Sequence, residues 1–178
     1  MNKPLFLLLA GSLLSAAPAW AAEGDWDRAK SAHERGDYAA ELAIIRPLAD
    51  KGYPFAQFNL GVLYDEGKGM PEDNAKAMEW YRKAAEQGFS QAQVNLGIMY
   101  EQGEGTPADP VRAYFWYALA ESQGDGLAPQ GKQDIAKKMT PAQIGEAERQ
   151  VKEYLATHKF VIPPLPPVPN SGAGHGNG

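Results

Sequence analysis

The chain has 178 residues, with 22 acidic residues against 17 lysines and arginines, a net charge of −5 and no cysteine. A nucleic-acid-binding protein needs a basic surface to follow the phosphates, so this charge argues against a nucleic-acid partner. The lack of cysteine excludes disulfides, thiol catalysis and cysteine-ligated zinc sites, and the length suits one domain of ordinary size.

Residues 1–21 have the pattern of a secretory signal peptide. Lys3 supplies the positive start, residues 5–17 are an apolar run, and Pro18 breaks that run before an Ala-x-Ala cleavage site that ends at Ala21. The run is shorter than the roughly 20 residues that span a bilayer. We expect cleavage after Ala21, which leaves no transmembrane segment and a periplasmic or secreted protein; an uncleaved anchor is the alternative.

The first pair of helices is expected between residues 25 and 52. A helix over residues 25–35 is joined through Gly36 to a second helix over residues 37–52. This second segment aligns, at an offset of 36 residues, with residues 73–88 further along the chain. The pair lacks a long internal loop.

Two near-copies of one unit follow, residues 56–88 and 92–124, at an offset of 36 residues. The paired positions are Ala56/Ala92, Leu60/Leu96, Gly61/Gly97, Tyr64/Tyr100, Gly67/Gly103, Gly69/Gly105, Pro71/Pro107, Asp73/Asp109, Ala77/Ala113, Trp80/Trp116, Tyr81/Tyr117 and Ala84/Ala120. The Ala, Leu and Tyr positions form one apolar helical stripe, and the glycine beside the leucine predicts a closely packed neighbouring helix. The Gly/Pro loop and the aspartate that caps a second helix predict an antiparallel helix pair.

The pattern continues in weaker form to about residue 160. Ala128 lies 36 residues after Ala92 and opens a degenerate first helix. Thr140 and Gln143 then form a capping box, with Pro141 at the first helical position of a final helix. About four helix pairs therefore occupy residues 22–160, and residues 161–178 are expected to form a Pro/Gly-rich disordered tail. The alternative is that this tail is a ligand, either docked on the groove of its own chain or bound by another protein.

The motif LGxxYxxGxGxPxD, followed by Ala, Trp-Tyr and AAxxG, resembles the Sel-one-like repeat, a longer-looped relative of the tetratricopeptide repeat. The resemblance is specific over residues 54–124. It implies an all-α, right-handed α/α solenoid and a role in protein interactions in envelope assembly, signalling or host contact.

Catalytic and metal-binding patterns are not found. His33, His158 and His175 are widely separated, and no serine has the context of a nucleophile elbow. The acidic residues near the loops do not follow a calcium-loop pattern. We therefore expect no enzyme activity, no metal and no cofactor. Trp80, Tyr81 and their equivalents could stack on sugars, but their spacing favours the core.

The resemblance and the geometry of stacked pairs place the first helices on a concave binding wall. The residues expected to face it are Phe55, Phe58, Asn59, Val62, Asp65 and Glu66 in one unit, and Gln91, Val94, Asn95, Ile98, Glu101 and Gln102 in the next. Asn59 and Asn95 repeat at 36 residues, so their amides could hold the backbone of an extended peptide, or could instead cap a loop carbonyl.

Two functions are compatible with this pattern. The first is a non-enzymatic scaffold or adaptor in the bacterial envelope that binds a peptide or protein, identity unknown, on its concave surface. The alternative is a cell-wall or polysaccharide-binding module, possibly hydrolytic. The sequence provides no carboxylate pair held at the separation that glycoside hydrolysis requires, which favours the scaffold.

Overall fold

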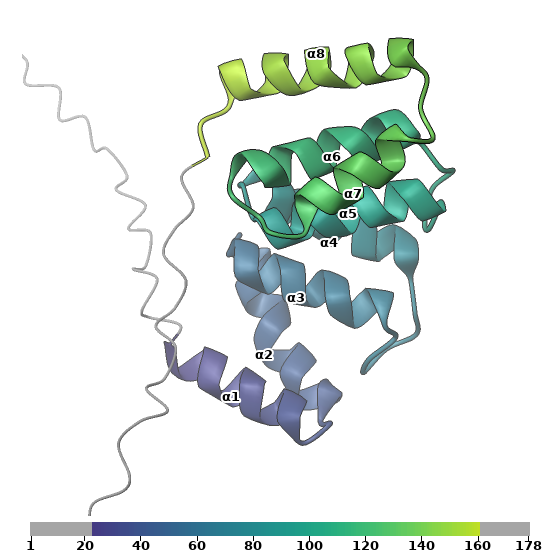
Figure 1. Cartoon of the computed structure of the whole chain (residues 1–178). Helices are drawn as coiled ribbons and strands as arrows, with labels where there is room; N and C mark the ends of the chain where they lie inside the picture. Colours follow the sequence, from purple (N-terminus) through teal and green to yellow (C-terminus); the bar gives the residue numbers. More distant parts are fainter. Residues whose placement is uncertain (1–22, 161–178) are drawn as a thin grey trace, which may run out of the picture.

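The computed structural model describes residues 23–160, and in this range the chain is built of helices without strands (Figure 1). The predicted signal peptide and the predicted disordered tail lie outside the described residues. The helices are, in chain order, α1 (Glu23–Glu34), α2 (Tyr38–Asp50), α3 (Pro54–Asp65), α4 (Asn74–Glu86), α5 (Ser90–Gln102), α6 (Pro110–Ser122), α7 (Ala128–Ala136) and α8 (Pro141–Thr157).

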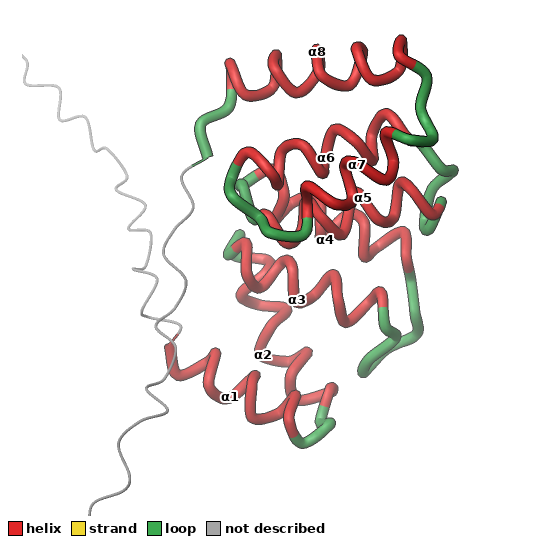
Figure 2. The backbone as a smooth tube through the Cα atoms, in the orientation of Figure 1, coloured by secondary structure: helices red, strands yellow, loops and turns green. Residues whose placement is uncertain are grey.

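The helices form a solenoid of antiparallel pairs, as the sequence predicts. The helices α1 and α2, α3 and α4, and α5 and α6 pack as pairs, and each second helix packs on the first helix of the next pair. Connections within pairs lie along one edge of the stack, and connections between pairs lie along the opposite edge (Figure 2). The odd-numbered helices α1, α3, α5 and α7 therefore follow one another along the stack, and we call the surface that they present the first-helix face.

The expected helix boundaries depend on local chemistry that the structure contains. The side chain of Asp73 accepts a hydrogen bond from the backbone N–H of Lys76 at the start of α4, and Asp109 does the same for Arg112 at the start of α6. At the end of α5, Gly103 adopts the left-handed conformation with φ of 79°. Thr140 forms the predicted capping box of α8.

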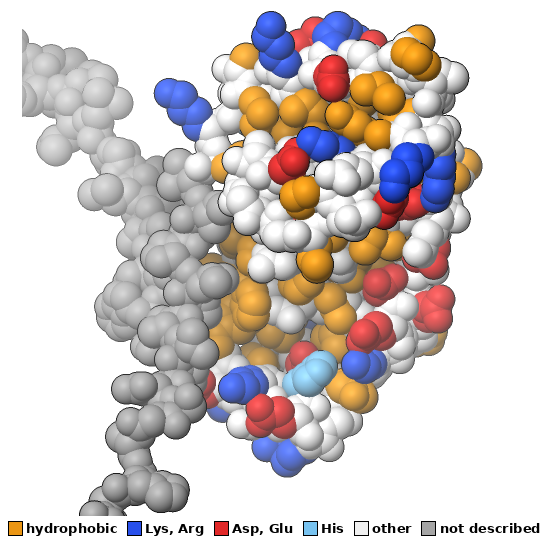
Figure 3. Space-filling view, in the orientation of Figure 1, with side chains coloured by type: hydrophobic (Ala, Val, Ile, Leu, Met, Phe, Trp, Pro, Cys, Tyr) orange, Lys and Arg blue, Asp and Glu red, His pale blue; other side chains and the backbone are white. Residues whose placement is uncertain are grey.

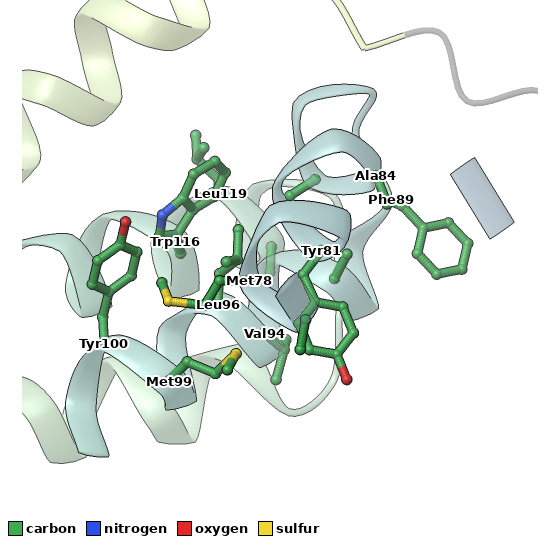
Figure 4. Packing of buried hydrophobic residues seen from close by; sticks show 14 of the residues in the cluster. Met78, Tyr81, Ala84, Phe89, Val94, Leu96, Met99, Tyr100, Trp116 and Leu119 are labelled. Atoms are coloured by element: carbon green, nitrogen blue, oxygen red, sulfur yellow. The ribbon is translucent and has the colours of Figure 1, made fainter. Parts of the chain in front are cut away.

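The core lies between the two helix layers and contains the repeated apolar positions. Figure 4 shows Met78, Leu96 and Trp116, from α4, α5 and α6, gathered in this region, and all three side chains are buried. Gly61 and Gly97 lie at the predicted helix crossings, because a Cβ on either residue would come within 2.6 Å of the ring of Tyr81 or Tyr117.

Buried glutamines join consecutive pairs by hydrogen bonds. Gln93 is fully buried, its Nε2 donates to the carbonyl of Ala85 in the preceding pair at 3.0 Å, and its Oε1 accepts from Gln123 at 2.6 Å. Gln57 makes the equivalent bonds one repeat earlier. Each of these first helices is thereby bonded to the second helix before it and to the chain just after the second helix of its own pair.

The last two helices depart from the regular pairing. The helix α8 packs mainly against α6, whereas α7 packs on α6 and α5 and has little contact with α8. The cause is visible in the sequence of α7, which has Lys132 and Gln133 where the repeats have the Leu-Gly pair of the crossing, and Ala136 where they have tyrosine. Without that stripe, α7 does not form with α8 the close crossing that Gly61 and Gly97 form within the repeats, although its Gly131 packs closely on Tyr117 of α6.

Candidate binding surface

The predicted wall residues lie along α3 and α5, with Glu66 at the C-terminal cap of α3. Four of them are exposed: Glu66, Gln91, Ile98 and Gln102. Seven are partly buried: Phe55, Phe58, Asn59, Val62, Asp65, Asn95 and Glu101. The two helices are neighbours on the first-helix face, so the structure brings these residues onto one side of the stack.

The prediction that Val94 faces the groove is wrong. Its side chain is 8% exposed and belongs to the hydrophobic core. Val94 lies near the start of α5, where the preceding residues Phe89 and Ala92 are also buried. The inward-facing surface at this end of the helix is therefore wider than the Ala-Leu-Tyr stripe alone predicts.

The two asparagines do not form a matching pair of free amides. The Nδ2 of Asn59 donates to the backbone carbonyl of Phe55 at 2.8 Å, one turn back in its own helix. The side chain of Asn95 instead lies beside the hydroxyl of Tyr81. The alternative interpretation of Asn59, in which its amide satisfies a carbonyl of the chain, describes it better than a peptide clamp, although the carbonyl belongs to a helix and not to a loop.

A continuous row of aromatic rings crosses the first-helix face, formed by Trp26, Phe55, Phe58 and Phe89, which we call the aromatic row. The ring centroids of Trp26 and Phe55 are 4.8 Å apart, those of Phe55 and Phe89 are 6.0 Å apart, and those of Phe58 and Phe89 are 5.2 Å apart. Phe89 is buried and the other three are partly exposed. The space-filling view shows hydrophobic side chains exposed in the lower half of the molecule and also in its upper half, below α8 (Figure 3).

Sequence reasoning identified Phe55 and Phe58 but missed the other two members of the row. Phe89 had a detectable signal, because Tyr53 precedes it by 36 residues and both residues are the N-caps of first helices. Trp26 had no such signal. It belongs to the leading pair, and its contact with Phe55 arises only when α1 packs beside α3.

The acidic residues at the C-terminal ends of α3 and α5 are already engaged within the protein. Asp65 accepts a hydrogen bond from the Tyr81 hydroxyl at 3.1 Å, and Glu66 pairs with Lys68 at 2.6 Å. Glu101 accepts one from the Tyr117 hydroxyl at 3.1 Å and pairs with Lys138. Their negative charge is therefore partly compensated, which weakens the attraction for a basic ligand that the sequence predicts.

The two tyrosines that hold these carboxylates remain protonated donors. Burial raises the pKa of the Tyr81 hydroxyl, and the negative charge of Asp65 raises it further. Burial also raises the pKa of Tyr117, together with its hydrogen bond to Glu101. Burial raises the pKa of the Asp65 carboxyl as well, against the lowering effect of the bond from Tyr81.

The histidines are not brought together by the fold. His33 on α1 bonds to Glu41 at 2.9 Å, and the ring of His158 stacks on Tyr154 with centroids 3.9 Å apart. His175 lies outside the described residues. Residues 23–160 contain no group of three or more His, Asp or Glu side chains placed to hold a metal ion. A membrane crossing needs a long, continuously apolar helix, and this part of the chain contains none.

The repeated tryptophans and tyrosines of the second helices are mostly core residues, as their spacing predicts. Tyr81, Trp116 and Tyr117 are buried. Trp80 is partly exposed, and the ammonium of Lys83 lies over its ring at 3.6 Å.

Residues 54–89 and 90–125 each match the Sel1 repeat family. The chain carries two Sel1 repeats. This confirms the resemblance that the 36-residue spacing indicates, and it places the boundary between the repeats at the turn before α5. Sel1 repeat proteins generally mediate protein–protein interactions.

Solved Sel1-type structures share the arrangement of helices. A protective antigen of uropathogenic Escherichia coli that displays an SLR fold is 32% identical, with a TM-score of 0.71 over 80% of this chain and 31% of that chain. A Sel1 repeat protein from Oxalobacter formigenes is 38% identical, with a TM-score of 0.53 over 55% of this chain and 28% of that one. The Sel1 repeats of this chain thus belong to an SLR-type solenoid.

The curated relatives match over a shorter stretch. The rat and mouse proteins named DAP3-binding cell death enhancer 1 are each 42% identical over 43 residues, which is 24% of this chain. The match spans only 8% of the length of each relative. The likeness therefore covers a small part of those proteins and says nothing of the rest of them.

Proposed function

We propose that this protein is a non-enzymatic scaffold of the bacterial cell envelope that binds an extended peptide or protein segment on its first-helix face. The observation that carries the proposal is the three partly exposed rings of the aromatic row on α1 and α3, together with Ile98 on α5, which is 36% exposed. A surface of this kind provides apolar anchoring sites for a partner. The Sel1 repeats support a protein partner, and residues 1–21 support the location.

The chemistry of the face favours an apolar segment over a strongly basic one. Asp65, Glu66 and Glu101 are bonded to donors of the same chain, so a basic ligand has to compete with Tyr81, Lys68 and Lys138. Paired surface charges contribute little to binding energy. The rings and aliphatic groups lose water on binding, and this burial supplies most of the favourable free energy of association.

The test is affinity capture from envelope extract with matched pairs of substitutions. The face variant combines Ile98→Ser with Glu66→Gln. The control combines Leu155→Ser on α8, where the leucine is 37% exposed, with Glu79→Gln on α4, where the glutamate is exposed. A partner that binds this face is retained by the wild type and by the control, and is reduced at least severalfold by the face variant.

Two outcomes would contradict the proposal. Equal capture by both variants would move the interaction surface away from α3 and α5. Co-sedimentation with peptidoglycan or exopolysaccharide, without any protein whose capture depends on the face, would favour the polysaccharide-binding alternative.

A further inference from the structure

The described chain ends beside the aromatic row. Phe160 follows α8 and lies against the turn between α4 and α5, where a Cβ built on Gly88 would come within 2.7 Å of the Phe160 Cβ. Gly88 directly precedes Phe89, the buried member of the row. After the last helix the chain turns back along the stack (Figure 1). Its last described residue, Phe160, therefore lies close to the row.

The contact with Phe160 occurs at only one of three equivalent turns between helix pairs in the described part of the chain. Gly52, Gly88 and Gly124 occupy equivalent turns, with φ of 91°, 90° and 83°. Within residues 23–160, a Cβ on Gly52 or Gly124 would meet no atom within 4 Å, whereas Gly88 is covered by Phe160. The approach of the C-terminal chain is thus specific to the turn that carries Phe89.

The next nine residues, VIPPLPPVP, have a composition that suits an apolar, aromatic surface. They contain five prolines and no charged or hydrogen-bonding side chain. A polyproline II helix has three residues per turn and advances about 3.1 Å per residue. In that conformation Ile162, Leu165 and Val168 would share one edge, and the prolines with Val161 would form the other two. Every edge of the segment is therefore apolar.

The aromatic row offers what such a segment needs. Proline-rich segments bind to grooves lined with aromatic rings, which pack against the flat pyrrolidine faces. Nine residues in a polyproline II helix extend over about 28 Å, which is several times the 4.8 to 6.0 Å between neighbouring rings of the row. The segment is long enough to follow the row from Phe89 toward Trp26.

A buried hydroxyl near the start of the segment provides a second indication. Tyr154 lies close to Phe160, with ring centroids 5.9 Å apart. Its hydroxyl oxygen is buried and has no hydrogen-bond partner among the described residues. Proline-rich backbone supplies carbonyl acceptors but few N–H donors, so it can accept from a tyrosine hydroxyl of this kind.

We infer that residues 161–169 bind in a polyproline II conformation along the aromatic row of their own chain, beginning at Phe160 on Gly88. The first-helix face is then a polyproline-binding surface with an intramolecular occupant. A tethered segment acts at a high effective concentration, so an external ligand of this face has to displace it. The inference concerns the free protein and does not depend on an external partner.

The test uses the absence of cysteine from the chain. A single substitution, Ser171→Cys, carries a nitroxide label just beyond the proline segment of the full mature chain. Trp26 lies on the first-helix face, whereas Trp80 and Trp116 lie on second helices. We expect the label to broaden the indole N–H signal of Trp26 at least severalfold more than those of Trp80 and Trp116. Equal broadening of the three signals would overturn the inference.

Two further measurements separate the possible causes of broadening. Leu165→Ser with Val168→Ser should abolish the preferential effect on Trp26, while the control Ala173→Ser should leave it intact; persistence in the first variant would contradict apolar docking. A mixture of spin-labelled and isotope-labelled copies should show no preferential broadening. If it does, the occupant comes from a second copy and the intramolecular assignment is wrong.

Discussion

The ring of Tyr117 occupies the space that a side chain at Gly97 would need, because a Cβ there would lie 2.6 Å from Tyr117 Cε1. We therefore expect Gly97→Ala to lower the free energy of unfolding by about 1 to 3 kcal/mol, the usual cost of overpacking a core. Denaturant unfolding of the purified protein measures this change.

Gly145→Ala is a control for which we expect the free energy of unfolding to change in the opposite direction. Gly145 lies in α8, and a Cβ there would meet no atom of the described part of the chain within 4 Å. Gly145→Ala should raise the free energy of unfolding by up to about 1 kcal/mol, since alanine is the better helix former. A similar loss of stability in both variants would show that the crossing at Gly97 is not closely packed.

The contact of Phe160 with Gly88 can be tested against an equivalent glycine. Gly88→Ala and Gly52→Ala both place alanine at a φ near 90°, so both lose stability through backbone strain. Only the alanine at residue 88 also collides with Phe160. We expect Gly88→Ala to lower the melting temperature more than Gly52→Ala, and Phe160→Gly, which removes the Cβ that meets residue 88, to remove most of the difference. Equal losses in the two single variants would place Phe160 away from the turn.

Asp65 should make the stability of the protein depend on pH. Burial raises the pKa of this carboxyl above its ordinary value of 3.8, and Glu66 and Glu72 add to this effect against the hydrogen bond from Tyr81. The folded chain then holds the proton more tightly than the unfolded chain, so the contribution of Asp65 falls as pH rises from 3.8 through the raised pKa.

Asp65→Asn has no proton to lose in this range. We expect its free energy of unfolding, relative to the wild type, to increase as pH rises through that window and to stay constant above it. Urea unfolding from acidic to neutral pH measures the difference. Parallel curves for the two proteins would mean that the environment of Asp65 does not raise its pKa.

Export remains a prediction from residues 1–21. We expect the protein recovered from the periplasmic fraction or the medium to begin at Ala22, because the Ala-x-Ala site ends at Ala21. Intact mass spectrometry checks the new N-terminus. Recovery of the full-length chain from the membrane fraction would contradict cleavage.

The sequence predicted the helix ends and helix crossings well, because each depends on a single residue with a well-defined physical role. Asp73 and Asp109 cap their helices, Thr140 forms a capping box, and Gly61 and Gly97 lie at helix crossings. Each of these roles depends on neighbours within a few residues or on the 36-residue spacing. The solenoid follows from repeating them.

Features that depend on packing between units were not predictable in the same way. Val94 is buried because the inward-facing surface widens at the start of α5, and the Asn59 amide bonds back to its own helix. The contact of Trp26 with Phe55 joins two helices whose sequences share no repeat pattern at those positions. The only sign in the sequence that α7 packs little against α8 was the replacement of the Leu-Gly pair of the repeats by Lys132 and Gln133.

The buried glutamines give the stack a single alignment. The apolar positions of each first helix, such as Ala56, Leu60 and Tyr64, recur every four residues. A helix shifted along its axis by one turn would therefore still present an apolar stripe to its neighbour. Hydrophobic contact alone discriminates weakly between these two positions because it has no direction. The amide of Gln93 does have a direction, and a shift of one turn would remove both of its partners inside the core. Leaving such groups unpaired costs about 1 to 3 kcal/mol each. The hydrogen bonds of the buried glutamines therefore set the axial position of each first helix relative to the helix pair before it.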